Sequence, residues 1–127
     1  MLLYVIEAVI PLLTGQLAWA ARLALRKDKE RHRRMAAIHA ISVWGSYFIV
    51  WAMILLGHTL KGNAPRWIVN THLVIIYILP VMLVFMMATG LKGVRKVHIP
   101  LAILYVFLWA AALATGAMIF LAHRGYI

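Results

Sequence analysis

The chain has 127 residues, of which 65% are hydrophobic, and its 13 Lys and Arg residues are balanced by only three acids, Glu7, Asp28 and Glu30. A soluble domain of this length has no interior large enough for so much apolar surface. The net charge of +10 does not indicate nucleic-acid binding, because the chain offers no soluble basic surface. The absence of cysteine excludes disulfides, thiolate metal sites, iron–sulfur clusters and covalently attached c-type haem.

Four long apolar runs follow one another, over residues 2–25, 35–60, 67–91 and 98–122. Each has about 24 residues, and a helix that rises about 1.5 Å per residue needs about 20 to cross a hydrocarbon core of about 30 Å. None alternates as a transmembrane β-strand does, so helices are the structure compatible with lipid. The sequence therefore predicts an all-α integral membrane protein, a single domain of four transmembrane helices in an up-down-up-down bundle.

The first run, MLLYVIEAVIPLL, has no basic region before it and carries Glu7 early, so we expect a first span rather than a cleaved signal peptide. Most of the Lys and Arg residues lie in RKDKERHRR (26–34) and KGVRK (92–96). By the positive-inside rule, these two loops face the cytoplasm and both termini face outward. The positive charge is then explained by topology and by anionic lipid headgroups.

Short connections predict that consecutive helices are antiparallel neighbours, and a faint internal repeat supports two related hairpins. AMILLGHT (52–59) resembles AMIFLAHR (117–124), and RHRRMAAIH (31–39) resembles RKVHIPLAI (95–103). The two matches share an offset of about 65 residues, although apolar segments also repeat by chance.

Six histidines are the most informative residues, because an ionisable group inside a membrane is costly and suggests a functional site. They fall into two layers: His32, His39 and His98 on the cytoplasmic side, and His58, His72 and His123 on the outer side. If the second helix extends back through the basic loop, His32 and His39 nearly share a face and are about 10 Å apart. At most one of these two can then ligate a given iron. On the fourth helix, one stripe is predicted to carry His98, Tyr105, Trp109, Gly116 and His123.

Neutral imidazoles on facing helices of an apolar bundle suit b-type haem, whose iron accepts a nitrogen ligand on each side. The predicted inner pair is His39 or His32 with His98, and the predicted outer pair is His72 with His58 or His123. One or two haems held in this way would form an electron path across the membrane. The structural alternative is a solvated cation for His32 and His123, and a hydrogen bond to a neighbouring helix for the others.

Other chemistry has less support in the sequence. No motif for hydrolysis or phosphoryl transfer is present. Glu7 is the one acid within a span and can relay protons or bind a quinone; a copper or zinc site with Met53 near His58 is a further alternative. Trp44, Trp51 and Trp109 lie deep in their spans, where they face lipid or pack on a flat cofactor.

Several motifs resemble the small four-helix membrane proteins that include the oxidase assembly factor CtaM. They are HRR at the end of the first loop, GHTL closing the second run, NTHLVIIYILPVML in the third, and VRKVHIPLA and ATGAMIFL in the fourth. The resemblance covers nearly the whole chain and points to His32, His58, His72 and His98, with Thr115 and Gly116 as a packing motif. The chain departs from this family in its shorter termini and in His39, an extra buried histidine that leaves the inner ligand open.

KVHIPLAILYVFLWAAALATG (96–116) is also similar to the last haem-binding helix of small two-haem cytochrome b relatives, such as ferric-reductase-like membrane domains. The resulting prediction is a b-type haem protein of a prokaryotic cytoplasmic membrane that transfers electrons to or from quinone or a partner redox subunit. The alternative is an accessory or assembly subunit of a respiratory or photosynthetic complex without a cofactor. In either role, the expected partners are membrane lipid and a larger redox complex or a second copy, and an electron-transfer or accessory subunit is expected in preference to a stand-alone enzyme.

Overall fold

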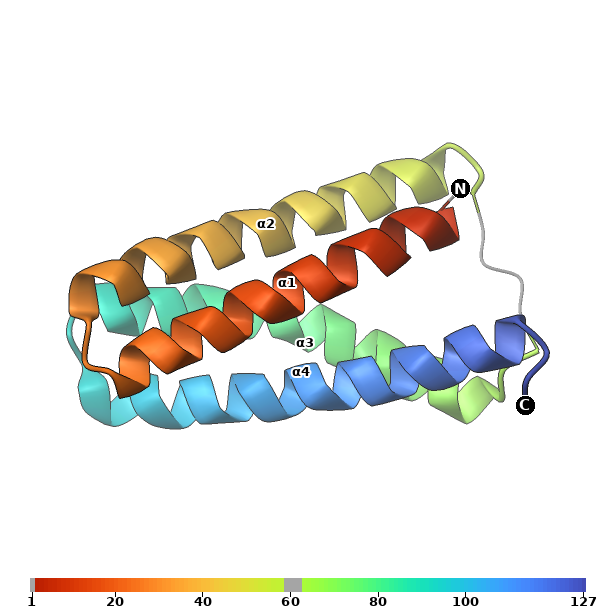
Figure 1. Ribbon diagram of the computed structural model, residues 1–127. Coiled ribbons are helices and arrows are strands. Elements are labelled where there is room, and N and C mark those ends of the chain that lie inside the picture. The colour runs from red at the N-terminus through yellow and green to blue at the C-terminus, as the bar shows by residue number, and fades with distance from the viewer. Residues whose placement is uncertain (1, 59–62) are drawn as a thin grey trace. The chain divides into compact units, whose positions relative to one another are not determined.

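The computed structural model of the chain describes residues 2–58 and 63–127, which form four long helices (Figure 1). They are α1 (Leu2–Leu25), α2 (Lys29–Leu55), α3 (Arg66–Leu91) and α4 (Arg95–His123). Each is long and apolar enough to cross a membrane, yet only 11–28% of its most apolar window is buried. The apolar surface therefore faces outward, as lipid requires, and the prediction of an all-helical protein with four transmembrane helices is confirmed.

The chain divides into two compact units, Met1–Leu60 and Lys61–Ile127. In the first unit α2 packs antiparallel against α1, and in the second α4 packs antiparallel against α3. Each unit is thus a helical hairpin, and the prediction that consecutive helices pair as antiparallel neighbours is confirmed within each.

The helix boundaries differ from the apolar runs mainly at α2. It begins at Lys29, six residues before the apolar run, because Asp28 caps it: its carboxylate accepts the backbone N–H of Arg31 at 3.2 Å. The basic segment predicted as a loop is therefore mostly helix, and only Arg26, Lys27 and Asp28 connect α1 to α2. At its other end α2 stops at Leu55, and Thr59 and Leu60 of the predicted run lie outside the described residues.

The turn between α1 and α2 and the turn between α3 and α4 have the same geometry. Corresponding residues of the two turns are 66 positions apart in the sequence, so Lys27 corresponds to Gly93. Both of these residues have left-handed backbone, with φ of 58° and 69°. The backbone bond from Asp28 N to Leu23 O corresponds to that from Val94 N to Thr89 O. With this offset of 66 residues, His32 corresponds to His98 in the repeat. The sequence alone had suggested an offset of about 65 residues.

A few residues fill the interior of each hairpin. In α1–α2 the buried residues are Leu13, Ala20, Leu23, His39, Val43 and Met53. In α3–α4 they are Ile68, Ile75, Leu79, Pro80, Leu83, Met86, Tyr105 and Ala122. Five of the residues on α3 are spaced by seven, four, four and three positions, which places them on a single helix face: Ile68, Ile75, Leu79, Leu83 and Met86. At the repeat position where the first hairpin buries His39, the second buries Tyr105.

Candidate functional site

His32 lies in the first turns of α2 and is tied to the end of α1. Its Nδ1 is 2.8 Å from the backbone oxygen of Ala20, and the side chain is half-buried. A carbonyl oxygen only accepts, so Nδ1 carries the proton and donates it, and the lone pair of the neutral ring is on Nε2. His32 therefore links two helices and is not fully solvated.

His98 occupies the same place in the second hairpin. Its Nδ1 donates to the backbone oxygen of Met86 at 2.9 Å, which again puts the lone pair of the neutral ring on Nε2. The ring also packs closely against Gly90, where an added Cβ atom would be 3.0 Å from its Cε1. The acceptors Ala20 and Met86 are both twelve residues before their histidine.

His72 links α3 to the opposite end of α4. Its Nδ1 is 2.9 Å from Oγ1 of Thr115, and that hydroxyl donates its one proton to the backbone oxygen of Ala111 at 2.8 Å. The hydroxyl therefore accepts from Nδ1–H of the neutral imidazole, and the lone pair is on Nε2 once more. A Cβ atom at Gly116 would be 3.2 Å from Cε1 of His72. Thr115 and Gly116 thus form the packing surface for this ring.

His39 is the most deeply placed of the histidines, with 2% of its surface exposed. Its ring hydrogen-bonds to the backbone of Leu13 in α1. Because His39 follows His32 by seven residues and Leu13 precedes Ala20 by seven, the two imidazoles bridge α1 and α2 at levels about 10 Å apart. An iron atom can reach His39 only if the surrounding side chains move.

His58 and His123 lie at the far ends of their hairpins. His58 follows the last turn of α2, where its backbone N–H bonds to the oxygen of Met53 at 3.0 Å, and its side chain is half-buried. His123 ends α4 and is exposed, seven residues beyond Gly116, which corresponds to about 10 Å from the level of His72. The predicted pairings of these residues with His72, and of His39 or His32 with His98, stay predictions.

The other predicted groups are placed individually. Glu7 is half-buried in α1, and Met53 is buried in α2. Within residues 2–58 and 63–127, no three His, Cys, Asp or Glu side chains lie close enough together to hold a metal ion. The stripe predicted on α4 faces α3 at His98 and Gly116, and the rings of Tyr105 and Trp109 are 6.0 Å apart on it.

An aromatic stripe on α2 is a feature that the sequence revealed only in part. An open hollow of about 310 Å³ is lined by Trp44, Tyr47, Phe48 and Trp51. The spacing i, i+3, i+4, i+7 puts all four on one face, roughly 120° around the helix from His32 and His39. Counting helical spacing would have added Tyr47 and Phe48 to the two tryptophans. The hollow offers a flat ring an aromatic surface, without a histidine on that face.

The sequence identified the histidines but not their partners. Ala20, Met86 and Ala111 act through backbone oxygens, which carry no sequence signal. Gly90 could have been suspected, since small residues allow close helix contact in membranes. Comparison of the chain with models of known protein families, with curated proteins and with solved structures finds no match.

Proposed function

We propose that the chain is a membrane protein that binds b-type haem through histidine and passes electrons to or from quinone or a partner redox subunit. The observation that carries this proposal is a hydrogen-bonding pattern that His32, His72 and His98 share. Each donates Nδ1–H to an oxygen on the neighbouring helix. Histidines that ligate metals are held in this way, because the bond fixes the ring and makes Nε2 more basic.

The side chains of this protein that can ligate a metal fit haem. The chain has imidazoles and no thiols, and an apolar outer surface on every helix to receive a porphyrin ring. Haem, if bound, would supply one-electron chemistry, and the chain would supply imidazole nitrogen ligands, hold their rings in place and exclude water. We assign His98, His32 and His72 as the first candidates. His39 ranks below His32, because its ring is buried against Leu13.

The test is an absorption spectrum of the detergent-purified protein expressed with a supply of haem. The reduced-minus-oxidised difference is expected to contain the α-band of haem b. Replacing His98 or His32 by alanine is expected to remove or shift this band, and the matched variant His123→Ala, at the exposed end of α4, is expected to retain it. A purified protein with no α-band despite haem supply contradicts the proposal.

A second test concerns the group that holds His72. Thr115→Val removes the oxygen that accepts Nδ1–H, whereas Thr115→Ser keeps it. If His72 ligates haem, the valine variant is expected to shift the midpoint potential or the spectrum, and the serine variant to restore it. A purely structural histidine would change stability in the valine variant without any spectral effect.

The second candidate is an accessory or assembly subunit of a respiratory or photosynthetic complex, with no cofactor of its own. It is favoured by the close packing of His98 on Gly90 and of His72 on Gly116, since such contacts can serve helix association alone. The resemblance to the CtaM-like family also supports it. Co-purification with a larger complex, with normal assembly after His39, His72 and His98 are replaced by alanine, would favour this role over haem binding.

The proposed setting is a prokaryotic cytoplasmic membrane with both termini outside and the two basic turns inside. The support is the concentration of Lys and Arg around residues 26–34 and 92–96. Labelling of single cysteines introduced near each terminus and in each turn, with a membrane-impermeant reagent on intact cells, tests this topology. Labelling of the turns from outside would reverse it.

A further inference from the structure

The segment of residues 26–34, named here the basic turn, joins α1 to α2 and forms the charged first turns of α2. Its six cations are all exposed: Arg26, Lys27, Lys29, Arg31, Arg33 and Arg34. The apolar part of α2 starts only at Met35. Residues 29–34 rise about 9 Å along the helix, which is comparable with the 5–7 Å of headgroup layer on each side of a bilayer. The basic turn is therefore at headgroup depth.

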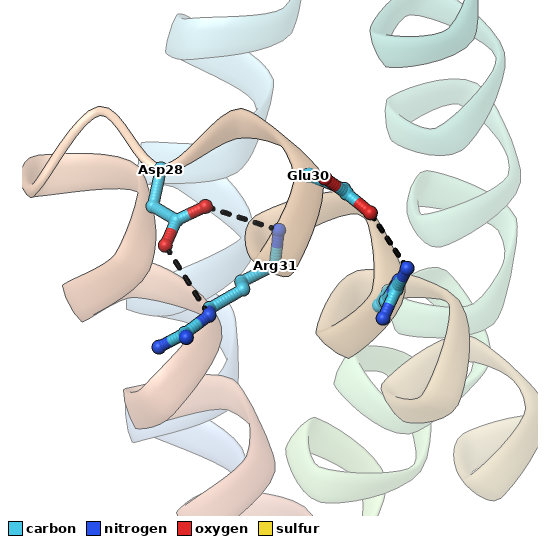
Figure 2. Close-up of polar contacts among 4 residues, drawn as sticks. Asp28, Glu30 and Arg31 are labelled. Carbon is cyan, nitrogen blue, oxygen red and sulfur yellow. Dashed lines mark hydrogen bonds and ion pairs between the residues drawn. The ribbon is translucent and has the colours of Figure 1, made fainter.

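Both acids in the basic turn are already engaged with arginines (Figure 2). Asp28 caps α2 and lies 3.6 Å from Nε of Arg31, and Glu30 accepts from Arg34 at 2.6 Å. Among the residues that the structure describes, no acid lies within ion-pair distance of Arg26, Lys27, Lys29 or Arg33. The basic turn thus carries a surplus of four positive charges.

The surplus cations are also placed near one another in the chain. Lys29 and Arg33 are four residues apart and share one face of α2. Arg26 and Lys27 lie in the connection just before it, where the left-handed conformation of Lys27 turns the chain. On α1, Arg22 is 5.6 Å from the ring of Trp19, a pair typical of the membrane interface.

The corresponding turn of the second hairpin has a smaller surplus of three exposed cations, Lys92, Arg95 and Lys96, with no acid in residues 92–96. At the positions of Arg26 and Lys29 it has Lys92 and Arg95, but at those of Lys27 and Arg33 it has Gly93 and Ile99. Orientation by the positive-inside rule applies equally to both turns. The first turn therefore exceeds the second by one uncompensated cation, and its larger surplus makes it the stronger candidate for binding an anionic headgroup.

We propose that Arg26, Lys27, Lys29 and Arg33 form a binding site for an anionic phospholipid of the adjoining leaflet. Four uncompensated cations at headgroup depth complement lipid phosphates, and clusters of this kind next to a transmembrane helix attract acidic lipids. A phospholipid places its phosphate at this depth, whereas a soluble phosphate must bind without the contribution of its acyl chains. The site does not depend on haem binding.

The test measures lipid binding to the detergent-purified full chain by native mass spectrometry, with phosphatidylcholine, phosphatidylglycerol, cardiolipin and inorganic phosphate as separate probes. The wild type is expected to retain phosphatidylglycerol and cardiolipin in preference to phosphatidylcholine, and not to retain inorganic phosphate. The variant R26Q/K27Q/K29Q/R33Q is expected to lose affinity by about fivefold for each cation removed. The variant K29Q/R33Q removes only the two cations that share one face of α2.

The second hairpin provides the matched control. R66Q/R124Q removes two exposed cations from the far ends of α3 and α4, a helix length from their turn, and is expected to change lipid affinity less than twofold because charges at that distance are screened. Glu30→Gln releases Arg34 and is expected to strengthen anionic-lipid binding. Equal loss in the control, equal retention of phosphatidylcholine, or tight binding of inorganic phosphate would each overturn the proposal.

Discussion

The hairpins α1–α2 and α3–α4 share the geometry of their turn and the histidine that follows it, but differ in what they bury and expose. His32 and His98 make the same backbone link, twelve residues back along the chain. At the next level inward, the first hairpin buries His39 and the second buries Tyr105. Only the second packs histidine rings closely against glycines, and the first has the larger surplus of cations in its turn. The common part builds the hairpin, and the differences lie in the residue buried below the histidine and in the charge of the turn.

The largest expected effect comes from removing the ring that fills the second hairpin. Tyr105 is 0% exposed, so Tyr105→Ala leaves a cavity and is expected to cost about 3–5 kcal/mol of unfolding free energy. In lipid the loss is mainly one of packing contacts. Helical circular dichroism during denaturation by SDS measures it.

The neighbouring variant Leu104→Ala is the control for Tyr105→Ala, since Leu104 is 50% exposed. It is expected to change stability by about 0.5 kcal/mol or less. Similar losses in the two variants would mean that Tyr105 does not hold the core of its hairpin.

The next effect tests the close packing of the histidine rings in the second hairpin. Gly116→Val puts side-chain carbons where a Cβ atom alone would be 3.2 Å from the ring of His72. Overpacking of this kind costs about 1–3 kcal/mol. At Gly45 of α2 no atom lies within 4 Å of an added Cβ, so Gly45→Val is expected to be nearly neutral in the same denaturation experiment.

A loss of stability at Gly45 as large as that at Gly116 would show that valine disturbs the helix itself, and that contact with His72 is not the cause. A stable Gly116→Val protein with a displaced imidazole would instead locate the effect at the candidate ligand. The haem spectrum of the variant distinguishes these two outcomes.

The sequence predicted the helices well, because their apolar runs are as long as a membrane is thick. It also predicted the basic boundary at which His32 and His39 lie. It misplaced the start of α2, since a run of charged residues reads as a loop until Asp28 is recognised as a cap. It could not predict that Ala20 and Met86 accept from His32 and His98, because any residue supplies a backbone oxygen. Predicting those contacts requires the register of two helices.

Substitutions at the left-handed residue of each turn are expected to have smaller effects on stability, with opposite signs in the two hairpins. Gly93 has φ of 69° and open space around its Cα, so Gly93→Ala is expected to cost about 1 kcal/mol through backbone conformation alone. Lys27 has the corresponding conformation with a side chain, so Lys27→Gly is expected to gain about as much. Denaturation of the two variants side by side measures both signs. Destabilisation by Lys27→Gly would mean that the lysine stabilises its turn through its side chain.

The smallest effect is expected at the exposed ion pair of Glu30 and Arg34. Both side chains are about three-quarters exposed to solvent, at 76% and 75%, so Glu30→Gln is expected to cost about 0.5 kcal/mol or less and to cost nothing at high salt. The repeat places Lys96 and Pro100 at these positions, so Lys96→Gln removes no such pair and serves as the control. Because Glu30→Gln also releases Arg34, it is expected to weaken folding slightly while strengthening anionic-lipid binding. Opposite changes in the two measurements would identify the charges of this turn as serving the membrane surface more than the fold, whereas a loss in both would make Glu30 a structural residue.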